Sequence, residues 1–164
     1  MKRSIIILRV LTAFCILSAV ALWFFFSPTR DEDRALEVSR EAHVPKETAM
    51  LSVNNTSITV EIVRTPEEFY KGLSGRTSLE PDFGMWFDFS TDGRQGIWMK
   101  DMKFPIDILW IDSNQIIITI EENVAPDTYP KVFYPTRDAR FVLEVSAGTV
   151  EKYSFEVGQE VFMK

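Results

Sequence analysis

The stretch Gly84–Glu121, GMWFDFSTDGRQGIWMKDMKFPIDILWIDSNQIIITIE, contains the strongest signs of a β fold. Its β-branched and aromatic residues gather in four short runs, at 84–89, 96–101, 106–111 and 115–121. Thr91-Asp92-Gly93 predicts a turn between the first two runs, and Asp112-Ser113-Asn114 predicts one between the last two. Pro105 separates the middle pair. Short strands joined by turns are typical of a sandwich or barrel.

The flanking sequence continues this pattern in both directions. Upstream, residues 50–53 and 56–63 flank Asn54-Asn55, a pair that favours a hairpin turn. Thr65-Pro66-Glu67-Glu68 then predicts the start of a short helix, which Gly72 ends. Downstream we expect a loop at 126–135, a strand at 140–145, a helical turn at 147–153 and an edge strand at 160–163. Residues 49–164 are therefore predicted to form a mainly β domain, a compact antiparallel β-sandwich or barrel-like fold with one or two short helices.

The N-terminus predicts a single transmembrane helix in residues 1–27. Residues 5–26 are almost wholly apolar, and Lys2 and Arg3 precede them, which favours an orientation with the N-terminus inside. A cleaved signal peptide with Ala19-Val20-Ala21 as its cleavage motif is the alternative. Residues 28–48 are dense in charge and predict a linker. Both alternatives place the domain on the extracytoplasmic side, either periplasmic or external, with residues 5–26 contacting the membrane in the first.

Composition excludes several kinds of chemistry. Beyond the apolar segment the chain has 15 basic and 24 acidic residues, so we expect no nucleic acid partner. The single histidine, His43, lies in the predicted linker, and the single cysteine, Cys15, lies in the apolar segment. The domain therefore lacks the residues of a Ser-His-Asp or Cys-His nucleophile and of the usual zinc sites, and we expect neither a metal nor a cofactor. The sequence leaves the oligomeric state open.

Charged and aromatic residues near the middle of the chain mark a candidate binding site. On a strand, Trp98 and Lys100 share one face, and Asp107 shares its face with apolar neighbours. A buried carboxylate needs a partner, and Lys100, Arg76 or Arg140 could supply one for Asp107. Two interpretations remain open: an ion pair that fixes the fold, or an anion- or sugar-binding pocket formed by Trp98, Lys100, Arg76 and Asp107.

The same region resembles the domain-of-unknown-function family 192. The similar motifs are Gly72-Leu73 with Arg76, Gly84-Met-Trp-Phe, Trp98-Met-Lys, Pro105-Ile-Asp-Ile and Phe141-Val-Leu-Glu-Val. The resemblance runs from about residue 57 to the C-terminus and implies a compact β-sandwich-like fold in a secreted or membrane-anchored prokaryotic protein. It implies no reaction. It adds Glu144 to the candidate binding residues, which are Arg76, Trp98, Lys100, Asp107 and Glu144.

Two functions of different classes fit these observations. The first is a membrane-tethered extracytoplasmic binding or interaction module that recognises a glycan or an envelope protein. The second is an envelope enzyme that acts on a saccharide with carboxylates alone, such as Asp101 or Asp107 with Glu144. Such an enzyme requires two carboxyl groups that face one cleft, roughly 5 to 10 Å apart.

Overall fold

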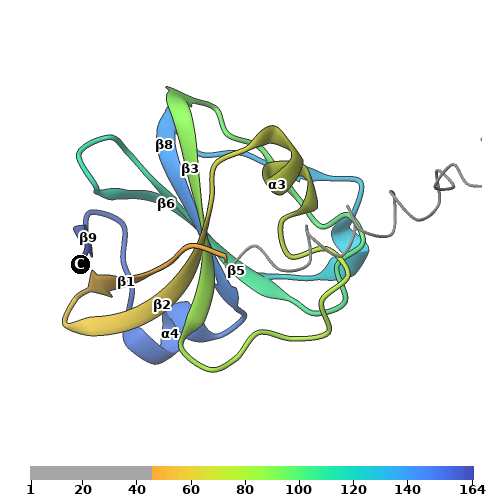
Figure 1. The fold of residues 1–164 in the computed structure, drawn as a ribbon, viewed down its shortest axis with the longest axis horizontal. Helices are drawn as coiled ribbons and strands as arrows, with labels where there is room; N and C mark the ends of the chain where they lie inside the picture. Colours follow the sequence, from red (N-terminus) through yellow and green to blue (C-terminus); the bar gives the residue numbers. More distant parts are fainter. Residues whose placement is uncertain (1–45) are drawn as a thin grey trace, which may run out of the picture. The chain divides into compact units, whose positions relative to one another are not determined.

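The computed structural model describes residues 46–164, which fold around a strongly curled β-sheet (Figure 1). The elements follow the chain as β1 (Thr48–Val53), β2 (Thr56–Val63), α3 (Pro66–Lys71), β3 (Phe83–Gly93), β4 (Ile97–Trp98), β5 (Ile106–Ile111), β6 (Ile117–Val124), the 3-10 turn η1 (Pro126–Thr128), β7 (Val132–Phe133), β8 (Ala139–Ser146), α4 (Thr149–Tyr153) and β9 (Val161–Met163). Within residues 46–164 no helix has the length and apolar character needed to span a membrane. The predicted anchor at residues 5–26 lies outside the described residues, as does most of the predicted linker.

Seven strands form one sheet in the order β6-β5-β8-β3-β2-β1-β9. The sheet curls until its two ends meet, where Ile116 forms a bridge with Glu160. Beside this bridge the Ile117 N–H donates to the Gln159 carbonyl at 2.9 Å. These bonds join one end of β6 to the segment that leads into β9, so the sheet forms a partly closed barrel whose edges are short.

Several local predictions are confirmed. Asn54 and Asn55 adopt φ values of 46° and 66° in the hairpin between β1 and β2. Helix α3 begins with the predicted capping box: the Thr65 hydroxyl accepts from the Glu68 N–H at 3.3 Å, and the Glu68 carboxylate accepts from the Thr65 N–H at 2.9 Å. Gly72 ends this helix with a φ of 44°. These features depend on neighbours within a few residues, which explains why the sequence predicts them.

The prediction of an antiparallel sandwich needs correction in its topology. Strands β2 and β3 pair in parallel, because the chain between them passes through α3 and a long loop instead of a hairpin. The strands form one curled sheet with an additional two-stranded sheet, β4-β7, in place of the two stacked layers of a sandwich. The fold is therefore mainly β and barrel-like, with two short helices.

The predicted turn at Thr91-Asp92-Gly93 is also wrong. Strand β3 continues to Gly93, and the predicted strand at 96–101 is reduced to Ile97–Trp98, which pairs with β7. The register between β3 and β8 shifts after Asp88. The Trp110 indole N–H donates to the Gln95 carbonyl at 2.7 Å, which holds the chain over β5 and away from β3.

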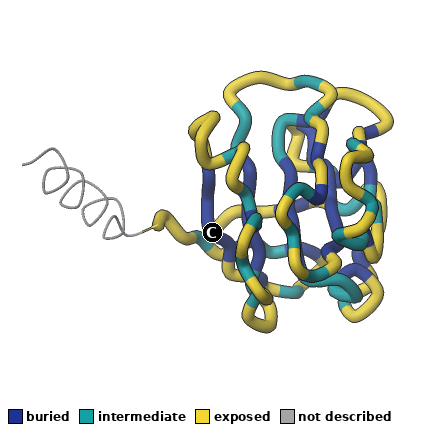
Figure 2. The backbone as a smooth tube through the Cα atoms, turned by 90° about the vertical axis from the view of Figure 1, so that its right-hand side faces the viewer, coloured by how far each residue is buried: buried dark blue, intermediate teal, exposed yellow. Residues whose placement is uncertain are grey.

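Apolar side chains pack on both faces of the curled sheet, and buried residues follow the strands in Figure 2. The inner core lies within the barrel and is closed at one end by Val150 and Phe155, from α4 and the residues after it. The outer core lies on the other face of β3, β5 and β8. It is covered by Phe69 of α3, Leu73, and Ile97 and Phe133 of the small sheet. The candidate site lies in this outer layer.

Candidate functional site

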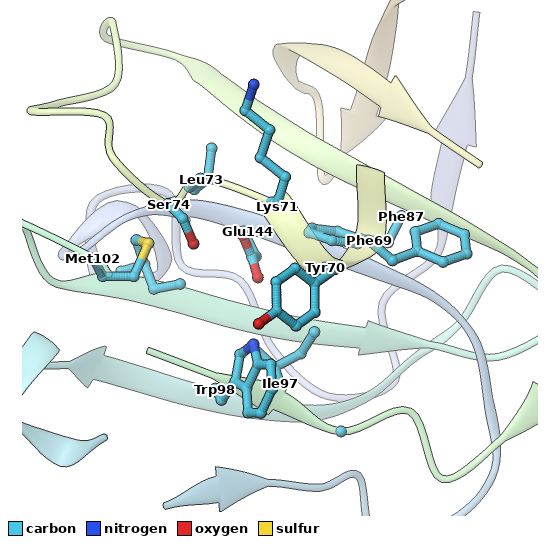
Figure 3. Close-up of a pocket in the computed structure, with 13 residues that line it drawn as sticks. Phe69, Tyr70, Lys71, Leu73, Ser74, Phe87, Ile97, Trp98, Met102 and Glu144 are labelled. Carbon is cyan, nitrogen blue, oxygen red and sulfur yellow. The ribbon is translucent and has the colours of Figure 1, made fainter. Parts of the chain in front are cut away.

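A small pocket opens between α3, β4 and the outer face of the sheet (Figure 3). It is lined by Phe69, Tyr70, Lys71, Gly72, Leu73, Ser74, Phe87, Gly96, Ile97, Trp98, Met102, Ile106 and Glu144. We call it the Glu144 pocket. Its cavity volume is about 40 Å³, which is room for about three water molecules. Two bonds fix its wall: the Ser74 hydroxyl donates to the Lys100 carbonyl at 2.8 Å, and the Gly75 N–H donates to the Asp101 carbonyl at 3.0 Å.

Two exposed aromatic residues that line the pocket, Tyr70 and Trp98, and the exposed Tyr129 beside Trp98 form what we call the aromatic rim. The Trp98 ring lies 5.8 Å from Tyr70 and 6.2 Å from Tyr129, both in edge-to-face geometry. Trp98 is 38% exposed and Tyr70 57% exposed. Large aromatic rings are usually buried, so a cluster of three at the surface marks a candidate interaction site.

Lys100 lies against the rim. Its ammonium is 4.5 Å from the centre of the Tyr70 ring and 5.9 Å from that of Trp98, and it hydrogen-bonds the Tyr70 hydroxyl. This bond raises the pKa of Lys100 above its ordinary value. Within residues 46–164 no carboxylate forms an ion pair with Lys100. The rim therefore carries a positive charge at neutral pH.

Glu144 forms the floor of the pocket. It lies on β8 between Met85 of β3 and Ile108 of β5, and it is 5% exposed. No hydrogen bond or ion pair within the described part of the chain involves its carboxyl group, and the carboxyl oxygens keep some access to solvent through the pocket. Burial raises the pKa of Glu144 to about 8, although the nearby charge of Arg76 lowers it. The carboxyl is therefore largely protonated at pH 7 and offers an O–H donor to the pocket.

Arg76 has a structural partner close to this floor. Its guanidinium donates to the Glu61 carboxylate at 2.7 Å, and Lys46 pairs with the other oxygen of Glu61. Burial acts to raise the pKa of Glu61, but the bonds from Lys46 and Arg76 outweigh it, so the pKa lies below its ordinary value. Glu61 and Glu144 share one face of the sheet, with Met85 of β3 between them. Arg76 thus holds Glu61 ionised while Glu144 stays unpaired.

Asp107 does not line the Glu144 pocket. It is 0% exposed and lies on the inner face of β5, opposite Val145. Its carboxylate accepts from two backbone N–H groups, those of Val150 and Asn123, each at 2.9 Å. Its partners are thus backbone amides, and the predicted partners Lys100, Arg76 and Arg140 are wrong. The reason is that α4 brings the Val150 N–H to Asp107 and β6 brings the Asn123 N–H, and both donors need an acceptor.

The structure brings Trp98, Lys100 and Glu144 together around one pocket and places Arg76 beside it. Asp107 and Glu144 point to opposite faces of the sheet, so these two carboxyls cannot flank one substrate. Sequence reasoning missed Tyr70, Ser74 and Tyr129. Tyr70 is a surface residue of a one-turn helix, and nothing in its local sequence indicates that it meets Trp98. Only the folded chain joins them.

A second pocket lies at the open end of the barrel. It has a cavity volume of about 180 Å³ and is lined by Leu51, Trp86, Asp88, Gln115, Phe141, Val161 and Met163. Trp86 and Phe141 stack there at 4.9 Å. Its one carboxylate, Asp88, is paired with Arg64 and Arg140. The two pockets share no lining residue, so the second pocket serves as a control surface in binding experiments.

Comparisons with known proteins place the chain in a family. Among solved structures, a protein from Sinorhizobium meliloti 1021 that has been proposed as a transcription regulator is 29% identical, with a TM-score of 0.70 over 74% of this chain and 97% of that chain. A protein of unknown function from Novosphingobium aromaticivorans DSM 12444 is 24% identical, with a TM-score of 0.66 over 70% and 84%, and shares the fold. No curated protein matches the chain. The profile of DUF192, described as "Uncharacterized ACR", matches residues 48–163, as the motifs of the sequence predicted, and the chain belongs to this family.

Proposed function

We propose that this chain is a membrane-tethered, extracytoplasmic binding module and that its ligand is a glycan. The observation that supports this most is the aromatic rim over a pocket with an unpaired carboxyl at its floor. The tether is the apolar segment at residues 5–26, followed by the charged linker.

Exposed aromatic rings beside hydrogen-bonding groups suit a sugar. The apolar face of a pyranose ring packs on an aromatic ring, while its hydroxyl groups bond to polar neighbours. Tyr70, Trp98 and Tyr129 supply the rings, and Lys100, Ser74 and Glu144 supply polar groups within the same site. The rings meet edge to face and are not stacked on one another, and each side chain is partly exposed to solvent. Proline-rich peptides are the other common ligands of exposed aromatic residues. They bind in grooves between aromatic side chains and would leave the polar floor of the pocket without a hydrogen-bond partner.

The Sinorhizobium relative suggests a different function, transcription regulation. The charge of the described domain does not favour this function. Residues 46–164 contain 12 basic and 19 acidic residues, and Arg64, Arg76, Arg137 and Arg140 are bound to carboxylates. A domain that binds nucleic acid normally presents a basic surface to the phosphates.

A saccharide-cleaving enzyme is the alternative function. Glu144, with its pKa of about 8, has the protonation state of a general acid at neutral pH. Cleavage needs a second carboxylate across the scissile bond. Within the described chain, Glu144 is the only carboxylate that lines the pocket. The geometry therefore supports binding better than cleavage.

The proposal is tested by probing an array of immobilised oligosaccharides with the labelled full-length chain in a detergent without a sugar headgroup. We expect the wild type to bind a subset of glycans and Trp98→Ala to lose this binding. Phe162→Ala, which removes an exposed aromatic ring on β9, is the matched control and should bind like the wild type. Failure to bind any glycan, or equal binding by Trp98→Ala, would contradict the proposal. Shortened products from a bound oligosaccharide would indicate the enzyme instead.

A further inference from the structure

We infer that the Glu144 pocket receives the acetamido group of an N-acetylated amino sugar, while the aromatic rim holds the sugar ring. This inference rests on the proposed glycan-binding function and names the class of glycan. It follows from three properties of the pocket: its hydrogen-bonding groups, its apolar wall and its charge.

The hydrogen-bonding groups match an acetamido group. The Glu144 carboxyl has no partner in the described chain and points into the pocket with the Ser74 hydroxyl and the Tyr70 ring (Figure 3). The protonated carboxyl donates one hydrogen bond, which the acetamido carbonyl can accept. Ser74 has already given its hydrogen to the Lys100 carbonyl, so its oxygen is left to accept from the acetamido N–H. Both polar atoms of the acetamido group then have a partner.

The remaining wall matches the methyl group. Leu73, Met102 and Ile106 line the pocket beside these polar groups. A volume of about 40 Å³ holds about three waters, which is close to the size of an acetamido group and too small for a sugar ring. The ring must therefore remain outside, where Trp98 and Tyr70 are exposed.

Charge near the pocket argues against an ammonium ligand. Five charged or titratable groups lie around Glu144: Tyr70 of α3, Arg76 of the following loop, Lys100 after β4, Glu61 of β2, and Glu121 of β6 on the far side of Ile108. Glu61 is already paired with Arg76 and Lys46. Lys71 lines the pocket with its backbone and stem, and its ammonium extends away from the pocket (Figure 3). Two nearby cations, Arg76 and Lys100, would repel a third. The neutral form of Glu144 is consistent with a neutral ligand.

The test uses three β-1,4-linked tetrasaccharides that differ at one position only. Chitotetraose has an acetamido group at C2, cellotetraose has a hydroxyl, and fully deacetylated chitotetraose has an amine. Their dissociation constants are measured by calorimetry with the full-length chain at pH 6.5 in a detergent without a sugar headgroup. We expect chitotetraose to bind about tenfold or more tightly than the other two, because they leave the pocket groups without partners.

Variants of the floor test the role of Glu144 directly. Glu144→Leu removes the donor and should lower chitotetraose affinity about tenfold, whereas Glu144→Gln retains an N–H donor and should keep most of it. The wild type should lose about tenfold in affinity at pH 9, where a carboxyl with a pKa of 8 is about nine-tenths ionised. Glu144→Gln should show no such loss.

The outcomes separate this inference from the proposed function. Equal binding of chitotetraose and cellotetraose would overturn the acetamido assignment and leave glycan binding intact. Tighter binding of the deacetylated sugar would show that the floor receives a cation, which also overturns the assignment. No binding of any of the three, with no hit on the oligosaccharide array, would overturn both.

Discussion

The pH dependence of stability should reveal Glu144 directly. Its pKa is about 8 in the folded chain against an ordinary value of 4.5, so the folded state holds this proton over a pH range in which the unfolded state releases it. Stability therefore falls as pH rises from about 4.5 to 8, the reverse of the behaviour of an ion-paired carboxylate. Each pKa unit corresponds to about 1.4 kcal/mol, so the loss between pH 5 and pH 9 is about 2 to 4 kcal/mol.

Replacing Glu144 with Gln should abolish this loss, because an amide of the same shape does not ionise. The variant and the wild type should have similar stability at pH 5, and the variant should be more stable by about 2 to 4 kcal/mol at pH 9. In urea unfolding this is a shift of the midpoint by about 1 to 2 M. The fragment of residues 46–164 suits the assay, because it contains both cores and the Sinorhizobium relative consists of little else.

Other titrating groups do not obscure the comparison. Hydrogen bonds lower the pKa of exposed Glu68 and Asp82, and in buried Glu61 such bonds outweigh the effect of burial, so the stabilising contribution of all three is lost only as the pH falls below their unfolded pKa values. The raised pKa of Lys100 acts above pH 10. Glu121→Gln is the matched control: Glu121 also lies beside Ile108, on β6, and is more exposed. Parallel stability profiles of Glu144→Gln and the wild type from pH 5 to pH 9 would refute the reasoning.

Three further results are expected from the same unfolding and NMR measurements. Asp107→Ala should destabilise the fold by about 2 to 4 kcal/mol, because the N–H groups of Val150 and Asn123 lose their acceptor. Asp107→Asn keeps one oxygen and should cost less. Equal stability of Asp107→Ala and the wild type would contradict this prediction. Gly84→Ala should lower the free energy of unfolding by about 1 to 3 kcal/mol, because the new Cβ would lie 2.7 Å from the Glu144 carbonyl oxygen. In the control variant, Gly93→Ala, the new Cβ meets only the end of the Gln95 side chain, at 3.2 Å. A Gly84→Ala variant as stable as the control would disprove that contact. Arg76→Ala should move the carboxyl ¹³C titration midpoint of Glu144 above 8, because the nearby positive charge is removed. A midpoint that stays the same or falls would show that Arg76 does not act on Glu144.

The parts of the fold that could be predicted from sequence are those decided by near neighbours. The run of largely apolar residues in Ile106–Ile111, the Asn54-Asn55 turn and the Thr65 capping box each depend on a few consecutive residues. The parallel pairing of β2 with β3 could not be predicted in this way, because it depends on how α3 and its loop return the chain to the sheet. Pairing of Trp98 with Val132 joins residues far apart in the chain.

The candidate site shows the same division. The residue pattern pointed to Trp98 and Lys100 as neighbours on one face, and the folded chain brings both to the rim. It also pointed to Asp107, whereas Glu144 became a candidate only through the family resemblance. Their difference arises from what covers each face. Asp107 receives one amide N–H from Val150 of α4 and one from Asn123 of β6, while the loop after α3 covers Glu144 and offers it none.

The most direct test of the account is an NMR titration of ¹⁵N-labelled residues 46–164 with chitotetraose. We expect chemical-shift changes at the Trp98 indole N–H and in the amides of Tyr70, Ser74 and Glu144. We expect none at Phe141 or Met163, which line the second pocket at the open end of the barrel. Shift changes in the second pocket without changes at the aromatic rim would contradict the proposed binding site, and so would a titration that changed the shifts at neither place.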